Sequence, residues 1–564
     1  MLNTVIKNKF SRLLKNMPTV PPPTNNLVTP MLTDLYQITM AYGYWKTKRH
    51  NEHAVFELFF RKNPFQGSYT VFCGIDEVLK YVQHFRFTSD DIEYLKTVPA
   101  LSHCDPGFFD YLSNVDCSEV TIDAAAQGSI VFPRTPLITV SGPLLVTQLL
   151  ETNMLNLVNY PSLVATNASR MVIAARGQHS DIKVRGKTPK CVEFGLRRAQ
   201  GPDGGFSASK YCMVGGFDAV ANVQAGKVLG IPIGGTHAHS FVMSFSSLEE
   251  VKDLEVKKEG SSTGSGGMVN LLEMVLKYRQ ETGWTETNDG ELAAFIAYGI
   301  AFPSSFLCLV DTYNTLNSGL KNFILVALAL ADCGYAPQGI RLDSGDLAIL
   351  SLKCHELLDE TAAKFDKPIF SDLDIVASDG INEKIMYDLK ESGHGISVFG
   401  IGTNLVTCQA QPALGCVFKL VELDGKPRIK LSNTIEKVLI PGRKRVFRMF
   451  DENEVPQLDL LIEVDDEIPQ AGKKVNCYSP FSKSDVKTIV PHRVEETLQT
   501  VWDKNGVVDA LPSLMNSRER CANEIKALNP AMLQAKNPLQ YDVFVSEKLR
   551  NDLHLLWESS KRDV

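Results

Sequence analysis

One pattern recurs along residues 190–410: a short β-rich run, a polar or glycine-containing cluster, and then a stretch with helical spacing. Four of the runs begin at 307, 339, 375 and 397, and their successive starts lie 32, 36 and 22 residues apart. Spacings of this size leave room for a helix between consecutive strands, as parallel pairing requires. The pattern therefore predicts an α/β fold with a parallel sheet.

Polar clusters follow six predicted strands. They are GLRRAQGPDGG (195–205), GGTHAHS (234–240), DTYN (311–314), DSGD (343–346), SDGIN (378–382) and GIGTN (400–404). The carboxyl ends of parallel strands meet at one edge, where barrels and doubly wound sheets both place their sites. The chain has no dinucleotide-binding G-x-G-x-x-G, and the clusters differ widely in charge. We therefore favour a barrel over a doubly wound sheet.

Charge, apolar runs and cysteine spacing exclude several classes of protein. Lys and Arg number 58 against 65 Asp and Glu, a net charge of −7, and no long basic block occurs. Because broad nucleic-acid affinity comes from neutralising phosphates, nucleic-acid binding is not expected. No stretch of 18 apolar residues occurs, so no membrane span is expected either. The twelve cysteines include no C-x-x-C pair, which argues against a zinc ribbon and indicates reduced thiols in the cytosol.

Changes in composition and residue pattern along the chain predict four segments. The first 33 residues contain no Asp or Glu, and a proline run ends their basic and apolar pattern, so residues 1–25 are expected to form a flexible extension. The same composition is typical of a mitochondrial transit peptide, which stays open as an alternative. We expect residues 26–160 and the strand-rich residues 411–564 to pack together, because neither part looks self-contained. Residues 161–410 form the predicted barrel.

Two clusters carry side chains suited to chemistry. In GGTHAHS, Thr236 offers a hydroxyl, and His237 or His239 suits acid–base catalysis or acceptance of a phosphoryl group. A buried structural histidine is the alternative. In RLDSGD, Arg341 and Asp343 share one face of a strand end. The arginine can bind a carboxylate or phosphate there, and the aspartate a ribose hydroxyl or Mg²⁺. The alternative is a structural ion pair.

Other clusters favour an anion site. GIGTN, with Gly402 and Thr403, and SDGIN are turns whose backbone N–H groups can bind an anion. Arg197 and Arg198, followed by glycines, suit a diphosphate, and a basic surface patch is the alternative. The chain has no G-x-x-x-x-G-K-[ST], so ATP would not be held by a P-loop. H-E-x-x-H is also missing, which weakens hydrolase functions.

Taken together, these motifs resemble the nicotinate phosphoribosyltransferase family, and in particular its animal type. The matching segments are TPMLTDLYQITMAYGYW (29–45), FELFFRKNPF (56–65), SGPLLVTQLLETNML (141–155), LVATNASR (163–170), FGLRRAQGPDGG (194–205), GGTHAHSF (234–241), RLDSGDL (341–347) and GIGTNLVT (400–407). Two regions depart from the family: the acid-poor tail, and the segment 177–190, which is longer than we expect.

The resemblance implies a type II phosphoribosyltransferase. Its fold would be an irregular TIM-like α/β barrel joined to an α/β open-faced sandwich built from both chain ends, in a homodimer with shared active sites. Its reaction would be the first step of NAD biosynthesis from nicotinic acid. Nicotinate and 5-phosphoribosyl 1-diphosphate would give nicotinate mononucleotide, with ATP as co-substrate and Mg²⁺ or Mn²⁺ as cofactor.

The family's functional residues carry over to matching positions. His239 would be the phosphorylated histidine, and Thr403 would bind phosphoribosyl diphosphate. Tyr36, Thr236 and Arg341 would bind nicotinate, the tyrosine by stacking on the pyridine ring and the arginine by pairing with the carboxylate. Further candidates are Arg170, Arg197, Asp343 and Gly402, and the metal ligands are left unassigned. A nicotinamide phosphoribosyltransferase and a non-catalytic binding protein on the same fold are the alternatives.

Overall fold

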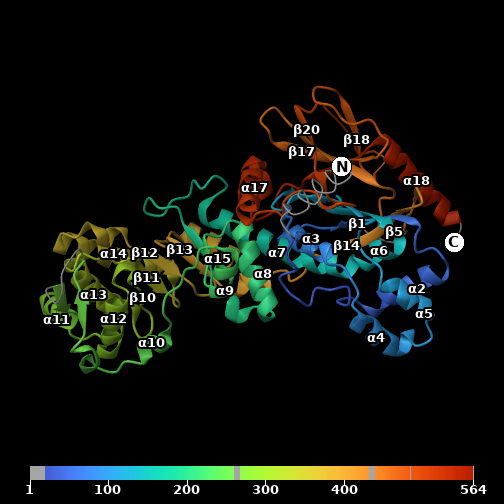
Figure 1. The fold of residues 1–564 in the computed structure, drawn as a ribbon. Coiled ribbons are helices and arrows are strands. Elements are labelled where there is room, and N and C mark those ends of the chain that lie inside the picture. The colour runs from blue at the N-terminus through green and yellow to red at the C-terminus, as the bar shows by residue number, and fades with distance from the viewer. Residues whose placement is uncertain (1–19, 260–266, 431–437, 483, 563–564) are drawn as a thin grey trace, which may run out of the picture. The chain divides into compact units, whose positions relative to one another are not determined.

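The computed structural model describes residues 20–259, 267–430, 438–482 and 484–562 (Figure 1). They form two compact units. Unit 1 consists of the described residues up to Leu163 and from Ala413 onward, and unit 2 runs from Val164 to Pro412. Most of the tail on which the transit-peptide hypothesis rests lies outside the described residues. Across the four described ranges, every helix is too short or too polar to cross a membrane.

Unit 2 is built on a six-stranded sheet in the order β10-β11-β12-β13-β6-β7. The strands are β6 (Lys190–Glu193), β7 (Ala219–Val220), β10 (Leu307–Leu309), β11 (Gly339–Leu342), β12 (Asp374–Ala377) and β13 (Val398–Ile401). All neighbours pair in parallel. The predicted α/β fold with a parallel sheet is therefore confirmed.

A helix follows β6, β10, β11, β12 and β13, as the repeating pattern predicts. The helices are α8 (Gly201–Val214), α13 (Leu320–Asp332), α14 (Leu347–Phe365), α15 (Glu383–Ser392) and α16 (Thr403–Thr407). The described strand pairings leave this sheet open where the predicted barrel would close. Ile233 makes only a parallel bridge to Val220 where a full strand was expected, and no pairing among the described residues joins β10 to that end of the sheet.

In its described residues, the long connection between β7 and β10 holds four helices and a short hairpin. They are α9 (Val223–Leu229), α10 (His239–Met243), α11 (Leu271–Thr282) and α12 (Asp289–Ala301), with β8 (Glu255–Lys257) and β9 (Met268–Asn270). A π-helix, η7 (Thr315–Gly319), leads from the loop after β10 into α13. Helix α13 is buried over most of its circumference, because it is apolar on nearly every face.

The larger sheet of unit 1 has the order β15-β14-β1-β5-β3-β21-β22. Its strands are β1 (His53–Phe59), β3 (Thr121–Ala125), β5 (Ile138–Pro143), β14 (Val417–Leu423), β15 (Lys426–Pro427), β21 (Leu498–Asp503) and β22 (Gly506–Val507). Strand β1 pairs with β5 on one side and with β14 on the other. The N-terminal and C-terminal parts of the chain therefore share one sheet.

A second sheet of unit 1 comes from the C-terminal part and has the order β19-β18-β23-β17-β16-β20. Its strands are β16 (Lys444–Phe450), β17 (Pro456–Glu463), β18 (Val475–Tyr478), β19 (Val486–Ile489), β20 (Arg493–Glu496) and β23 (Asp542–Val545). A two-stranded ladder joins β2 (Thr70–Val71) to β4 (Ile130–Val131).

Helices complete unit 1. They are α2 (Leu35–Lys46), α3 (Ile75–Gln83), α4 (Ser89–Thr97), α5 (Pro106–Leu112), α6 (Leu144–Leu149), α17 (Leu514–Ala527) and α18 (Glu547–Arg562). The predicted boundary between residues 160 and 161 falls inside one helix, α7 (Glu151–Arg176), which continues through Pro161.

A buried ion pair joins β1 to β16. The Lys444 ammonium lies 2.9 Å from the Glu57 carboxylate, and both side chains are 2% exposed. Lys444 also donates to the backbone carbonyls of Ile440 (2.8 Å) and Gly442 (2.7 Å). Removing one partner of such a pair costs about 3–5 kcal/mol because the other charge stays buried. The pair thus ties a strand near the start of the chain to one near its end.

Candidate active site

A cavity of about 620 Å³ lies in unit 2 at the carboxyl ends of the parallel strands. Its walls come from the loops after β6, β11, β12 and β13 and from the loop that follows Ile233. Six of the predicted site residues line it: Arg197, Thr236, Arg341, Asp343, Gly402 and Thr403. The structure thus brings together clusters that are more than 200 residues apart in the sequence.

Arg341, on β11, is the cation most tightly held in this cavity. Its Nη1 donates to the Thr236 hydroxyl at 3.0 Å and to the His237 carbonyl at 3.4 Å. Its Nη2 lies 3.2 Å from the Asp343 carboxylate. The Nε is buried and has no hydrogen-bond partner within the described residues. The ion pair that sequence reasoning left as an alternative forms, yet the guanidinium keeps donor capacity for a ligand anion.

Asp343 connects Arg341 to His239. The imidazole Nε2 of His239 lies 3.6 Å from Asp343 Oδ2, the oxygen that also meets Arg341. The other oxygen of Asp343 accepts a hydrogen bond from the Ser378 hydroxyl at 2.5 Å. His239 is the first residue of α10, and its side chain is 40% exposed. A histidine beside a carboxylate and open to solvent can act as a base or as a nucleophile.

Sequence reasoning singled out neither Asp311 nor Thr312 of the loop after β10. Asp311 accepts hydrogen bonds from the Asp343 backbone N–H (3.1 Å) and the Ser344 hydroxyl (2.5 Å). The Thr312 hydroxyl lies 3.2 Å from Nδ1 of His239. The signal was present, because DTYN is one of the polar clusters that follow a strand. Only the pairing of β10 with β11 shows which side chains it meets.

His237 has a different environment from His239. Its ring packs against Tyr298 (4.7 Å between centroids), Phe241 (5.5 Å) and Phe295 (6.1 Å). Neither ring nitrogen has a hydrogen-bond partner within the described part of the chain. Burial lowers the pKa of His237 to about 4, with smaller contributions from the charges of Arg341 and His239. The ring is therefore neutral near pH 7, and the structural alternative fits this histidine.

A second side of the cavity is formed by the loops after β6 and β13. Thr403 begins the short helix α16, directly after Gly402. Arg197 lies in a 3₁₀ turn, η3 (Leu196–Arg198), on the opposite loop. Glu193 anchors that loop, because its buried carboxylate accepts hydrogen bonds from the Gly195 backbone N–H and, at 2.9 Å, from the Ser209 hydroxyl. The arrangement presents an arginine and a threonine to one cavity.

Three predicted residues are not among those that line the cavity: His239, Arg170 and Tyr36. His239 adjoins the cavity through its contact with Asp343. Arg170, on α7, makes a bidentate ion pair with Glu383 of α15 (2.8 Å for both hydrogen bonds), so the structure gives it a bracing role. Tyr36 belongs to unit 1, where its ring on α2 is 46% exposed beside the exposed side chains of Leu35 and Met40. Partial burial raises the pKa of Tyr36.

Comparison with known proteins identifies the family. Three family models match the chain: the nicotinate phosphoribosyltransferase N-terminal domain over residues 31–159, the nicotinate phosphoribosyltransferase family over 189–456, and the nicotinate phosphoribosyltransferase C-terminal domain over 443–553. The chain belongs to the nicotinate phosphoribosyltransferase family. Nicotinate phosphoribosyltransferase of Dictyostelium discoideum is 47% identical over 95% of this chain and 90% of its own length. The human enzyme is 42% identical over 92% and 95%.

Solved structures agree with this family membership. The crystal structure of human nicotinic acid phosphoribosyltransferase superimposes with a TM-score of 0.82 and 39% identity, covering 93% of this chain and 99% of the human one. A nicotinate-nucleotide pyrophosphorylase from Pyrococcus furiosus has a TM-score of 0.57 at 17% identity over 91% and 99% of the two chains, so it shares the fold.

The environment of His237 predicts a pH dependence of stability. The unfolded chain protonates this residue near its ordinary pKa of 6.5, whereas the folded protein keeps it neutral down to about 4. The contribution of His237 to the free energy of unfolding is therefore complete above pH 6.5. It decreases by up to about 3 kcal/mol as the pH falls from 6.5 to about 4. A His237→Leu variant should lose less stability than the parent between pH 7 and pH 5, measured by urea unfolding. Tyr298→Phe, which keeps the imidazole in its aromatic cluster, is the control and should follow the parent; equal slopes in all three proteins would contradict the prediction.

Proposed function

We propose that this protein is a nicotinate phosphoribosyltransferase. It would convert nicotinate and 5-phosphoribosyl 1-diphosphate to nicotinate mononucleotide and diphosphate, with ATP and water giving ADP and phosphate. This is the first step of NAD biosynthesis from nicotinic acid. The observation that carries the proposal is the position of Arg341, held between Thr236 and Asp343 in a cavity whose opposite loops supply Arg197 and Thr403.

Arg341 is assigned to the nicotinate carboxylate. A guanidinium forms paired hydrogen bonds with a carboxylate, and it gains less from a neutral amide. Thr236, hydrogen-bonded to Arg341, would fix the orientation of that contact. This pairing favours nicotinate over nicotinamide and so ranks the nicotinamide enzyme as the alternative. Turnover of labelled nicotinate against nicotinamide, with and without ATP, separates the two enzymes from a non-catalytic binding protein.

Arg197, Gly402 and Thr403 are assigned to phosphoribosyl diphosphate. In the reaction the pyridine nitrogen forms a bond to C1 of the ribose as the bond from C1 to the diphosphate oxygen breaks. The transition state resembles an oxocarbenium ion, and the diphosphate leaves with the electron pair of the broken bond. Cationic and N–H groups that meet the leaving diphosphate stabilise its growing charge.

Mg²⁺ or Mn²⁺ fits the carboxylates beside this cavity. Mg²⁺ usually takes only one or two protein carboxylates and completes its shell with substrate phosphates and water. Asp311 offers such a ligand, because its Oδ1 is buried and has no hydrogen-bond partner within the described residues. Asp343 lies beside it, with its backbone N–H on the other oxygen of Asp311. When bound, the metal would neutralise charge on the departing diphosphate.

His239 is assigned as the residue that takes the γ-phosphoryl group of ATP. The P–O bond to ADP breaks as a P–N bond to the imidazole forms, and later hydrolysis releases phosphate. Asp343, 3.6 Å from Nε2, favours positive charge on the ring as this bond forms, and the Thr312 hydroxyl orients Nδ1. The same carboxylate contacts Arg341, so the phosphoryl-accepting and nicotinate-binding residues share one partner.

The active form is proposed to be a homodimer with shared sites. Tyr36 would supply the ring that stacks on the pyridine, and both it and Met40, one turn further along α2, are exposed. An exposed apolar patch of this kind favours contact with another protein surface. We propose a cytosolic location, supported by twelve free thiols, with mitochondrial import as the alternative.

The first test of this function is chemical labelling of His239. A His239→Ala variant should lose the acid-labile phosphate formed from ATP, and with it ATP hydrolysis during turnover. The neighbouring His237→Leu variant is the matched control and should still be labelled. Full labelling of His239→Ala by γ-labelled ATP would show that another residue accepts the phosphoryl group.

Substrate choice should depend on Arg341. Removing a buried partner of a carboxylate costs about 2–5 kcal/mol, which corresponds to about 30-fold to several-thousand-fold in affinity. Arg341→Ala should therefore raise the KM for nicotinate far more than the KM for phosphoribosyl diphosphate, and it should reduce discrimination against nicotinamide. Arg341→Lys keeps the charge without the paired donors, so its KM for nicotinate should lie between that of the parent and that of Arg341→Ala. Equal losses for both substrates would place Arg341 on the phosphate side.

Shared sites predict complementation between two inactive variants. Tyr36→Ala and His239→Ala, co-expressed so that subunits exchange, should give about half heterodimers, each with one intact site. The mixture should then reach about a quarter of the parent's specific activity. Each variant expressed alone is the control. Purified heterodimers no more active than those controls would mean that Tyr36 serves its own subunit.

A further inference from the structure

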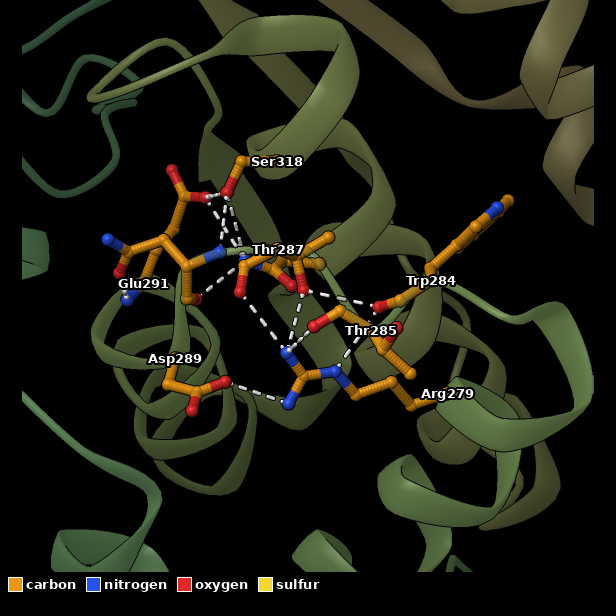
Figure 2. Close-up of polar contacts among 9 residues, drawn as sticks. Arg279, Trp284, Thr285, Thr287, Asp289, Glu291 and Ser318 are labelled. Atoms are coloured by element: carbon orange, nitrogen blue, oxygen red, sulfur yellow. Dashed lines mark hydrogen bonds and ion pairs between the residues drawn. The ribbon is translucent and has the colours of Figure 1, made fainter.

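The start of α12 is held by a dense polar network in unit 2 (Figure 2). Arg279, on α11, donates to three backbone carbonyls within residues 284–287 at 3.0–3.2 Å. Its Nη1 also lies 2.8 Å from the Asp289 carboxylate. These contacts fix the turn that leads into α12 and so fix the place of Glu291 in the first turn of that helix.

Glu291 joins this turn to the π-helix η7 of the next segment. Its Oε2 accepts hydrogen bonds from the Ser318 hydroxyl (2.5 Å) and from the Asn322 amide (3.1 Å). The Ser318 hydroxyl in turn accepts from the Asn288 backbone N–H at 3.0 Å. Glu291 and Asn322 are fully buried. Figure 2 shows Glu291 and Ser318 facing one another.

The π-helix carries this restraint to the loop after β10. Gly319, its last residue, packs against the backbone of Val310 so closely that a Cβ there would lie 1.9 Å from the Val310 carbonyl oxygen. Its N–H also donates to the Asn314 carbonyl at 2.9 Å, which closes the turn. The residues between these contacts include Asp311, which is hydrogen-bonded to Asp343, and Thr312, which is hydrogen-bonded to His239.

We propose that Glu291 is a positioning residue for His239. Its carboxylate holds the π-helix through Ser318, and the π-helix fixes the segment whose Thr312 hydroxyl orients the imidazole. This inference rests on the proposed phosphorylation of His239. It assigns a role in the phosphoryl step to a residue that is buried and belongs to no wall of the cavity.

Glu291 acts as a hydrogen-bond acceptor and not as a partner of a cation. No Lys or Arg forms an ion pair with it in the described part of the chain, and its Oε1 has no hydrogen-bond partner there. Burial raises the pKa of Glu291 to about 7, and the charge of Asp311 contributes in the same direction. A glutamine keeps an acceptor oxygen in the same place without the buried charge, so it should preserve the position of the π-helix, whereas alanine removes the acceptor.

The test compares the rate of His239 labelling by γ-labelled ATP with the KM for nicotinate. Ser318→Ala and Glu291→Ala should lower the labelling rate at least tenfold, while the KM for nicotinate changes less than threefold because Arg341 and Thr236 are intact. Glu291→Gln should recover labelling to within threefold of the parent. Ser318→Ala removes a single hydroxyl, so the test remains decisive if Glu291→Ala does not fold.

Ser351→Ala is the matched control. Ser351 is buried in the same unit and accepts a backbone N–H bond from Gly395 at 3.0 Å, but it does not line the cavity. It should lower the thermal midpoint as Ser318→Ala does, with labelling unchanged. If Ser318→Ala labels like Ser351→Ala, or if labelling and nicotinate KM worsen together, Glu291 only stabilises the fold and the inference is wrong. If the parent itself is not labelled on His239, the proposed phosphorylation fails first.

Discussion

The parallel register of β10, β11 and β12 is the constraint on which the rest of the site depends. Leu309 lies opposite Arg341, and Arg341 lies opposite Val376, so the three strands end at one level. Their following loops therefore meet, and Asp343 contacts the loops on both sides. Side chains alternate between the two faces of a strand, so a slip of one residue would turn Arg341 away from the cavity.

This arrangement lets one carboxylate serve two groups with different tasks. Asp343 contacts the guanidinium of Arg341 and the imidazole of His239 through the same oxygen. A substitution of Asp343 would disturb both, and its effect on activity could not be divided between the nicotinate binding and the phosphoryl transfer that we propose. Arg341 belongs to the proposed nicotinate side, and the network around Glu291 reaches His239 through Thr312.

Unit 1 depends on contacts between distant parts of the chain. Strand β1 lies between β5 from the N-terminal part and β14 from the C-terminal part. The buried pair of Glu57 and Lys444 adds a second link between the two parts. Neither chain end can complete this unit alone. Helix α2, which carries Tyr36, therefore belongs to a unit that forms only after the barrel segment has been synthesised.

The sequence by itself determined the α/β class, the polar clusters at the strand ends, and the common face of Arg341 and Asp343, because strand alternation and turn chemistry act over a few residues. Residue chemistry alone could not distinguish His237 from His239, and only the family resemblance selected His239, since burial among aromatic rings depends on helices outside their loop. Nor could it show that Arg170 pairs with Glu383, 213 residues away. Only the tertiary structure decided these contacts, because they depend on which strands and helices become neighbours. The local spacing of residues in the sequence does not specify those neighbours.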